Sequence, residues 1–313
     1  MTAATAGLDR VAARAEAPPL PRPKRRASPV EWIAVHFVFV VLAVFFIVPF
    51  LWLFSAAFDH KATAYLQFPV APTINNFVRI FTEHDFARVI INSVVFVVGS
   101  AIIGQFLLGL GLALLLDHAE RRGFIATNLV YAVVLLAWVN PTIIAGFLWV
   151  AMFDYYNGSL NVGLTHLGLG PVNWFGEAPM VAVIIANVWR GTAFTMLIFL
   201  GALRTIPSDI YEAARVDGAN AVRRFWDHTL PLLRPIAALT LLSITMATFG
   251  TFIVIQTLTN GGPALQTEVI ALYAFHEAFQ NHAVGYGSTI AVVMLALNLG
   301  FAVLFLRWSR ARA

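Results

Sequence analysis

The chain has 313 residues, of which 59% are hydrophobic and only 12% charged, and its formal net charge is +4. Soluble domains carry about 25% charged residues, so this composition excludes an ordinary soluble protein. The absence of cysteine excludes disulfide bonds, thiolate metal sites and cysteine nucleophiles.

The first 29 residues form a tail rich in Ala, Pro and Arg, without apolar periodicity. Such a composition cannot bury enough apolar surface to fold, so we expect a disordered tail. We do not expect a signal peptide here, because the apolar run that follows Arg26 is too long and lacks a small-residue cleavage pattern.

Residues 30–308 are predicted to form one transmembrane domain. A span needs about 20 mostly apolar residues, and it must be helical because lipid offers no partner to backbone polar groups. Asn140 and Pro141 are expected to kink the third segment. The prediction is an all-α protein with six spans and a short cytoplasmic C-terminus, 309–313; the spans are 30–54, 89–116, 124–153, 180–203, 235–258 and 286–306.

The lysine and arginine residues predict the orientation of these spans. Sixteen of the twenty lie in the two terminal tails and in the loops after the second and fourth spans, whereas three lie on the opposite side. The last one, Arg190, falls inside the fourth span. Because cytoplasmic loops carry an excess of Lys and Arg, both termini and the loop 204–234 are expected in the cytoplasm. Because these basic residues are scattered over four segments, they also disfavour a nucleic-acid-binding function.

The cytoplasmic loop 204–234 carries five arginines and four acids between two long apolar runs. Pro207 and Ser208 favour a helix start, and Gly218 permits the left-handed conformation that ends one. We therefore predict helices over 208–217 and 219–229, the second closed by Leu230 and Pro231. On spacing alone the loop could be an ordinary connector or a docking site.

The outer loop before the last span opens on a strong turn signal, Asn260-Gly261-Gly262-Pro263. After the turn, apolar residues keep helical spacing over 265–279, interrupted by His276. We predict a short interfacial helix there.

Catalytic motifs are absent from the sequence. The two lysines, Lys24 and Lys61, follow Pro23 and His60, so there is no phosphate-binding Gly-Lys-Ser/Thr motif. Zinc-protease and serine-hydrolase motifs are also missing, and the acids avoid the spans, so no buried carboxylate relay is visible. We expect no catalytic residue and no metal site.

The string Glu-Ala-Ala-x-x-x-Gly at 212–218, with Thr-Leu-Pro at 229–231, resembles the signature loop of bacterial ABC importer permeases. The flanking strings 203–207, 230–235 and 258–263 are similar to carbohydrate permeases of the maltose-type family. The resemblance covers about residues 76–306. The chain departs from the family pattern at His228, where Ile is usual, and its strings 72–77 and 260–263 resemble different members of the permease pair.

This resemblance implies a type I importer permease fold in the bacterial plasma membrane. It implies a coupling helix that docks on a separate ATPase subunit, formed by Glu212, Ala213, Ala214, Asp217 and Gly218. The implied partners are a second permease subunit, two ATPase subunits and an extracytoplasmic binding protein. ATP and Mg²⁺ would sit on the ATPase, with no cofactor in this chain.

Two helical faces are candidates for the substrate path, because transporter sites lie near the midplane on inward faces. One lies on the fourth span and the other on the fifth. The spacing aligns each set on one helix face. The residues are Asn187, Arg190, Gly191 and Phe194 on the fourth span, and Ile244, Ala247, Thr248 and Thr251 on the fifth.

The presence of Arg190 in a span is compatible with two classes of substrate. A charge within a span is costly and marks a functional site by default. It could pair with the partner subunit in an importer of neutral carbohydrate, or bind an anionic substrate such as a polyol phosphate. A self-sufficient channel or secondary carrier is a more remote alternative, since no buried carboxylates are visible.

Overall fold

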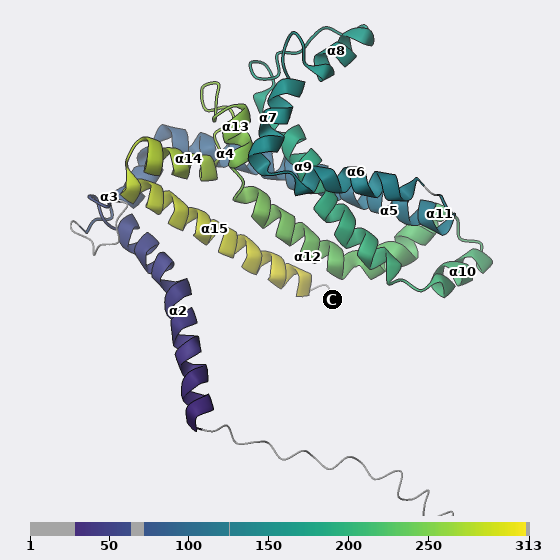
Figure 1. Cartoon of the computed structure of the whole chain (residues 1–313), viewed down its shortest axis with the longest axis horizontal. Helices are drawn as coiled ribbons and strands as arrows, with labels where there is room; N and C mark the ends of the chain where they lie inside the picture. Colours follow the sequence, from purple (N-terminus) through teal and green to yellow (C-terminus); the bar gives the residue numbers. More distant parts are fainter. Residues whose placement is uncertain (1–28, 64–71, 125, 311–313) are drawn as a thin grey trace, which may run out of the picture. The chain divides into compact units, whose positions relative to one another are not determined.

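The structure is a computed structural model that describes residues 29–63, 72–124 and 126–310 (Figure 1). The tail 1–28, predicted to be disordered, and the last three residues, 311–313, lie outside the described residues. All regular elements of the described residues are helices, which confirms the predicted fold class. The chain divides into two units, 1–51 and 52–313, and each is considered by itself.

Most of helix α2 (Pro29–Ala57) belongs to the first unit, and it supplies the first predicted span with a mean hydropathy of 2.9. The second unit contains the remaining helices, where η marks a π-helix. These are α3 (Asn75–Thr82), α4 (His84–Val97), η1 (Val98–Phe106), α5 (Leu107–Arg121), α6 (Thr127–Val139), α7 (Thr142–Met152), α8 (Ser159–His166), α9 (Pro179–Arg204), α10 (Ser208–Val216), α11 (Ala221–Arg224), η2 (Phe225–Thr229), α12 (Leu230–Phe249), α13 (Ile253–Leu258), α14 (Ile270–Phe275), η3 (His276–Gln280) and α15 (Val284–Arg310).

Five helical segments of the described chain are long and apolar enough to cross a membrane. They are α2, the continuous segment α4–η1–α5, α9, the segment α11–η2–α12, and α15. The α6–α7 pair makes a sixth if it counts as one broken span.

The predicted third span is two helices rather than one kinked helix. Helices α6 and α7 are bent by 106° at Asn140 and Pro141. Asn140 is extended, with a ψ of 133°, as expected for a residue whose helical conformation would clash with a following proline. The bend is therefore much sharper than the predicted kink.

The predicted fifth span, 235–258, is wrong at both ends. The helix begins at Ala221 and runs through Leu230 and Pro231, where the sequence predicted a stop. Directly before that proline the chain forms the π-helix η2, whose shifted hydrogen bonds accommodate the missing N–H. At the other end the helix stops at Phe249, and α13 follows as a separate short helix.

The predicted interfacial helix 265–279 begins later than expected, and much of it is buried in the protein. Leu265 lies in a turn with a φ of 61°, and the helix begins at Ile270. Val269 and Leu272 are 2% and 0% exposed, so this segment packs into the protein core.

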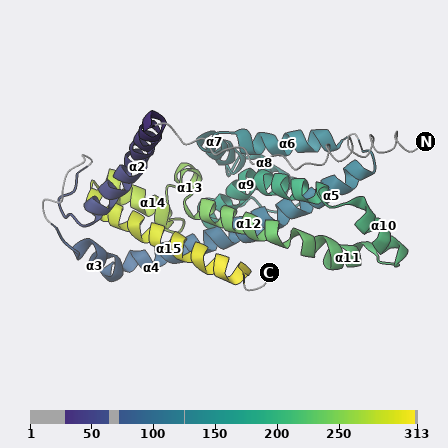
Figure 2. The ribbon, with the colours of Figure 1, turned by 90° about the horizontal axis from the view of Figure 1, so that it is seen from below.

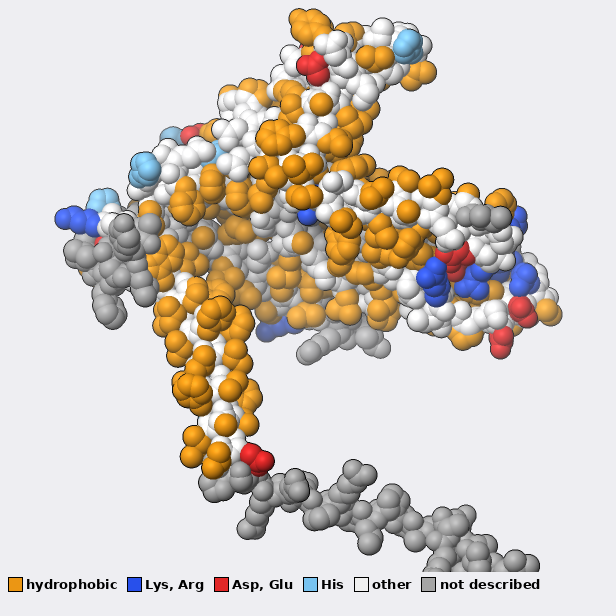
Figure 3. Space-filling view, in the orientation of Figure 1, with side chains coloured by type: hydrophobic (Ala, Val, Ile, Leu, Met, Phe, Trp, Pro, Cys, Tyr) orange, Lys and Arg blue, Asp and Glu red, His pale blue; other side chains and the backbone are white. Residues whose placement is uncertain are grey.

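Within the second unit, α10 and α11 lie at one end, and α3 and α14 lie at the opposite end (Figures 1 and 2). Helix α9 is central and packs against η1, α5, α6 and α12. One buried cluster lies beside α10 and includes Leu203, Ile206 and Leu233. Charged side chains gather at the α10–α11 end, whereas hydrophobic side chains cover the flanks of the long helices (Figure 3).

Candidate functional site

The charged segment at one end of the second unit is an ordered helical turn. Helix α10 spans Ser208–Val216, as predicted, and Gly218 ends the turn with a φ of 78°. Asn220 then caps α11, because its Oδ1 accepts a hydrogen bond from the backbone N–H of Arg223 at 2.8 Å. The segment therefore has a fixed shape before any partner binds.

The predicted coupling residues point in different directions. The Glu212 side chain is 65% exposed, and Ala213, Asp217 and Gly218 are also exposed. Ala214 is only 2% exposed and packs inward, so it does not offer a contact to a partner. Only four of the five residues are accessible.

Three exposed apolar side chains extend this surface, and the sequence analysis did not single them out for exposure. Val216, Val222 and Trp226 are 88%, 65% and 60% exposed. Exposed apolar side chains on a segment that also carries exposed charges are typical of a protein-docking site. The position of Val216 between two charged residues was the sequence signal that could have predicted its exposure.

Helix α10 contacts the C-terminal end of α5. A cavity of about 510 Å³ lies between them, lined by four arginines, two acids and His118 among others. Arg121 pairs with Asp117 within α5 at 2.8 Å, and its guanidinium lies 5.3 Å from the centre of the Tyr211 ring of α10. Arg204 at the base of α9 pairs with Glu120 at 2.6 Å. Movement of α10 would therefore be transmitted to α5 and α9.

His228 lies half-buried in η2, where the helix that leads into α12 widens. Its neighbour Thr229 donates a hydrogen bond to the Tyr211 hydroxyl at 3.3 Å, which joins η2 to α10. Nothing in the structure explains why a histidine stands at 228.

On the fourth span, the predicted substrate residues meet those of the fifth. Phe194 of α9 and Ile244 of α12 pack in one cluster with Val97 and Ala101. Asn187 is 5% exposed and Gly191 is half-buried. The two predicted faces therefore converge between α9 and α12.

The other three predicted residues of the fifth span differ in their surroundings. Thr248 is 3% exposed and Ala247 is exposed. Thr251 lies beyond the end of α12, and its hydroxyl donates to the carbonyl oxygen of Ala247 at 3.0 Å. The helical periodicity that placed Thr251 on this face thus fails at the helix break.

Arg190 is half-buried in α9, and its Nε atom is buried without a hydrogen-bond partner among the described residues. Within the described chain, no Asp or Glu oxygen lies within 4.0 Å of it. The guanidinium therefore has free donors for a ligand or a second subunit.

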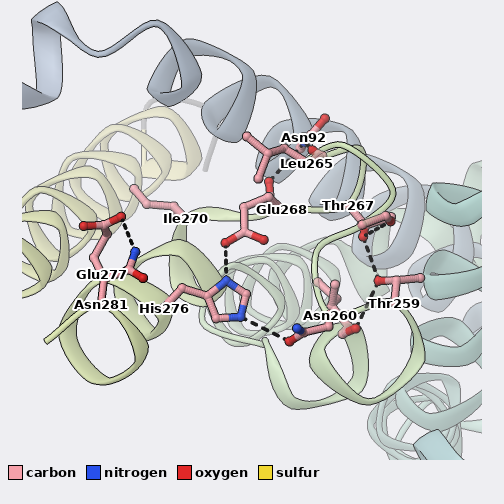
Figure 4. A network of polar contacts seen from close by, with 12 residues as sticks. Asn92, Thr259, Asn260, Leu265, Thr267, Glu268, Ile270, His276, Glu277 and Asn281 are labelled. Carbon is pink, nitrogen blue, oxygen red and sulfur yellow. Dashed lines mark hydrogen bonds and ion pairs between the residues drawn. The ribbon is translucent and has the colours of Figure 1, made fainter.

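At the opposite end, the turn 260–263 is held by a polar network (Figure 4). Asn92 of α4 donates to the carbonyl oxygens of Leu265 and Glu268 at 2.6 and 3.1 Å. The hydroxyls of Thr259 and Thr267 lie 2.7 Å apart. The loop is therefore fixed to α4 and to itself rather than free.

Glu268 lies at the centre of this network and is 1% exposed. Burial raises its pKa to about 7, and the nearby charge of Glu277 adds to the shift. His276, whose pKa burial lowers, lies 2.8 Å from Glu268 Oε1 and 3.2 Å from Asn260 Oδ1. The histidine that interrupts the predicted apolar stripe is thus the partner of a buried carboxyl.

Apolar spans with polar side chains buried between them, and an exposed, charged helical segment at one end, fit a membrane transport permease. The chain belongs to the family of binding-protein-dependent transport system inner membrane components, whose family model matches residues 105–311. It is therefore a multi-pass membrane protein.

The chain is 33% identical to the trehalose/maltose transport system permease protein of Thermococcus litoralis over 292 residues, which cover 92% of this chain and 96% of that protein. It is 31% identical to the sn-glycerol-3-phosphate transport system permease protein of Rhizobium meliloti, with coverages of 76% and 80%. A solved bacterial alginate ABC transporter, in complex with an alginate pentasaccharide-bound periplasmic protein, has a chain with the same fold. The TM-score is 0.76 at 22% identity, covering 90% of this chain and 94% of that one.

Proposed function

We propose that this chain is the permease subunit of an ATP-driven importer that moves a carbohydrate, with an oligosaccharide as the expected substrate, by alternating access. The observation that carries this proposal is the exposed surface around Glu212, Ala213 and Val216, which fits a docking partner. The trehalose/maltose relative, which spans nearly the whole chain, supports the substrate class.

In this proposal the chain itself performs no catalysis. ATP and Mg²⁺ bind to two ATPase subunits that dock on the cytoplasmic α10–α11 segment. A second permease subunit completes the path, and an extracytoplasmic binding protein delivers the substrate. Both chain termini lie in the cytoplasm, as the distribution of Lys and Arg predicts. Residues 30–308 form the transmembrane domain, and 204–234 form its coupling loop.

The substrate path in this proposal lies between α9 and α12. Phe194 and Ile244 supply apolar contact, and Asn187 and Thr248 supply polar groups. Thr251 and Ala247 would line its outer end, next to the break after α12.

An anionic substrate is the second candidate, because Arg190 has free donors and the glycerol-phosphate relative matches most of this chain. Replacing Arg190 by Leu separates the candidates in proteoliposomes that contain the complete transporter. Uptake of maltose or trehalose but not of glycerol 3-phosphate by the native transporter would favour carbohydrate as substrate. Native uptake of glycerol 3-phosphate that Arg190→Leu abolishes, with neutral-sugar uptake intact, would favour the anion.

The importer class itself is tested by reconstituting the chain alone and with its partners. Sugar uptake that requires the ATPase subunits and ATP supports the proposal. Uptake by the chain alone without ATP would instead favour a secondary carrier or channel.

A further inference from the structure

The π-helix η1 packs unusually closely on α9, at the level of the proposed substrate path. A Cβ atom added at Gly99 would lie 2.7 Å from the Ile184 side chain, and one at Gly104 would collide with Val188. Glycine at both positions lets the two backbones approach. π-Helical turns are frequent at functional sites, so the residues of η1 that face α9 are candidates for a role in transport.

Gly191 has no side chain and so leaves a small space on α9, here called the notch at Gly191. The side chain of Gln105, in η1, fills this notch. A Cβ atom at Gly191 would overlap the Gln105 amide, so the amide lies directly against this glycine. The Gln105 side chain is buried, with the residue 5% exposed, and comes from the second span. No residue of the second span was predicted to lie in the path.

Packing, rather than hydrogen bonding, holds the Gln105 amide. Its Nε2 lies 3.4 Å from the carbonyl oxygen of Asn187, which is long for a hydrogen bond. That oxygen belongs to the interior of helix α9, where the helix already provides it with a donor. A ligand that offers a stronger hydrogen-bond partner can therefore replace this long contact.

Two buried donors on the same helix turn have no partner among the described residues. They are Nδ2 of Asn187 and Nε of Arg190. Leaving a buried donor without a partner is unfavourable, so a hydroxyl group that accepts a hydrogen bond from it is favoured. Together with the Gln105 amide, these atoms make a polar patch between two apolar spans.

We propose that Gln105 belongs to the translocation path: its amide closes the notch at Gly191 in this conformation and hydrogen bonds a sugar hydroxyl when the notch opens. The inference rests on the proposed function of the chain as a carbohydrate permease. It adds a third wall, from η1, to the path between α9 and α12, and makes Gln105 a substrate-positioning residue.

The absence of native cysteine allows a direct accessibility test. Gln105→Cys is introduced into the complete transporter, and a charged methanethiosulfonate reagent is applied without nucleotide and in the ATP-trapped state. Labelling is measured on this chain by mass. Ala113→Cys, on the same continuous helix and 0% exposed, is the matched control. We expect Gln105→Cys to react in one state at least tenfold faster than in the other, and the control to stay inert in both.

A second variant tests the contact with substrate. Gln105→Met keeps the length and most of the volume but removes the amide. We expect the KM of maltose or trehalose uptake to rise about fivefold, as for one lost hydrogen bond. A role in packing alone would lower the yield of assembled complex and leave the KM unchanged.

The outcomes separate this inference from the proposed function. If Gln105→Cys is as inert as the control in both states, or if Gln105→Met imports sugar with the native KM, Gln105 is not in the path while the permease assignment stands. If the native transporter imports neither sugar, the proposed substrate class fails, and the labelling still decides whether Gln105 faces water.

Discussion

His276 Nδ1 lies 2.8 Å from Oε1 of Glu268, and this buried pair joins η3 to the outer turn that precedes α14 (Figure 4). The two groups titrate in opposite senses. Burial raises the pKa of Glu268 from its ordinary 4.5 to about 7 and lowers that of His276. Protonated Glu268 therefore stabilises the fold below pH 4.5, and this contribution is lost as the pH rises through 7. The contribution of His276 is present above its ordinary pKa and is lost as the pH falls.

The variant Glu268→Gln isolates the carboxyl, because glutamine resembles the protonated form and retains a donor for His276. Relative to this variant, the native chain should lose at most about 3 kcal/mol of unfolding free energy as the pH rises from 4.5 to 7. Thermal unfolding of the purified transporter at several pH values measures the shift. A difference that does not change with pH would mean that Glu268 titrates normally.

Two adjacent glycines in this turn should respond differently to alanine. Gly261 has a φ of 84°, and a Cβ atom there would collide with the Glu268 carboxyl group. A Cβ atom at Gly262 would come no closer than 3.3 Å to the Thr259 carbonyl oxygen. Gly261→Ala should therefore cost about 2 kcal/mol or more, and Gly262→Ala much less. Comparable melting temperatures for the two variants would contradict this assignment of strain.

Asn92 of α4 should hold the loop 260–268 in place. Its amide donates to the carbonyl oxygens of Leu265 and Glu268, and Asn92→Leu removes both donors. We expect amide hydrogen exchange in 260–270 to accelerate by about tenfold, as for one to two lost hydrogen bonds. Ser243→Ala, which removes an exposed bond to Leu239 within α12, is the control and should leave this segment unchanged. Equal protection in both variants would show that Asn92 does not hold the loop.

Local sequence signals were enough to predict some elements. Apolar runs placed most of the spans, and Ser208 and Gly218 bounded α10 because helix starts and left-handed ends have residue preferences. The helix end after Phe249 was missed because the apolar pattern continues unbroken past Gly250. The continuation through Pro231 was missed because it depends on a π-turn that periodicity does not reveal.

The parts of the site that depend on tertiary contacts were not predictable from one sequence. Gln105 and Gly191 are far apart in the chain and meet only when η1 packs on α9. In the same way, a carboxyl at 268 and a histidine at 276 show no pattern until η3 folds back on the turn. Which face of α10 is free, with Ala214 turned inward and Val216 outward, depends on the cluster beside it.

The assignment of α10 as the coupling helix is tested most directly by ATP-driven sugar uptake into proteoliposomes. The transporters compared carry Glu212→Lys or Ala213→Trp, with Ala213→Ser as the conservative control. Both residues are exposed on α10 and contribute little to the core, so folding should be preserved. We expect both variants to assemble their spans normally and to lose transport and ATPase binding, whereas the control keeps both. Native uptake and ATPase binding in both Glu212→Lys and Ala213→Trp would contradict the assignment of α10 as the coupling helix.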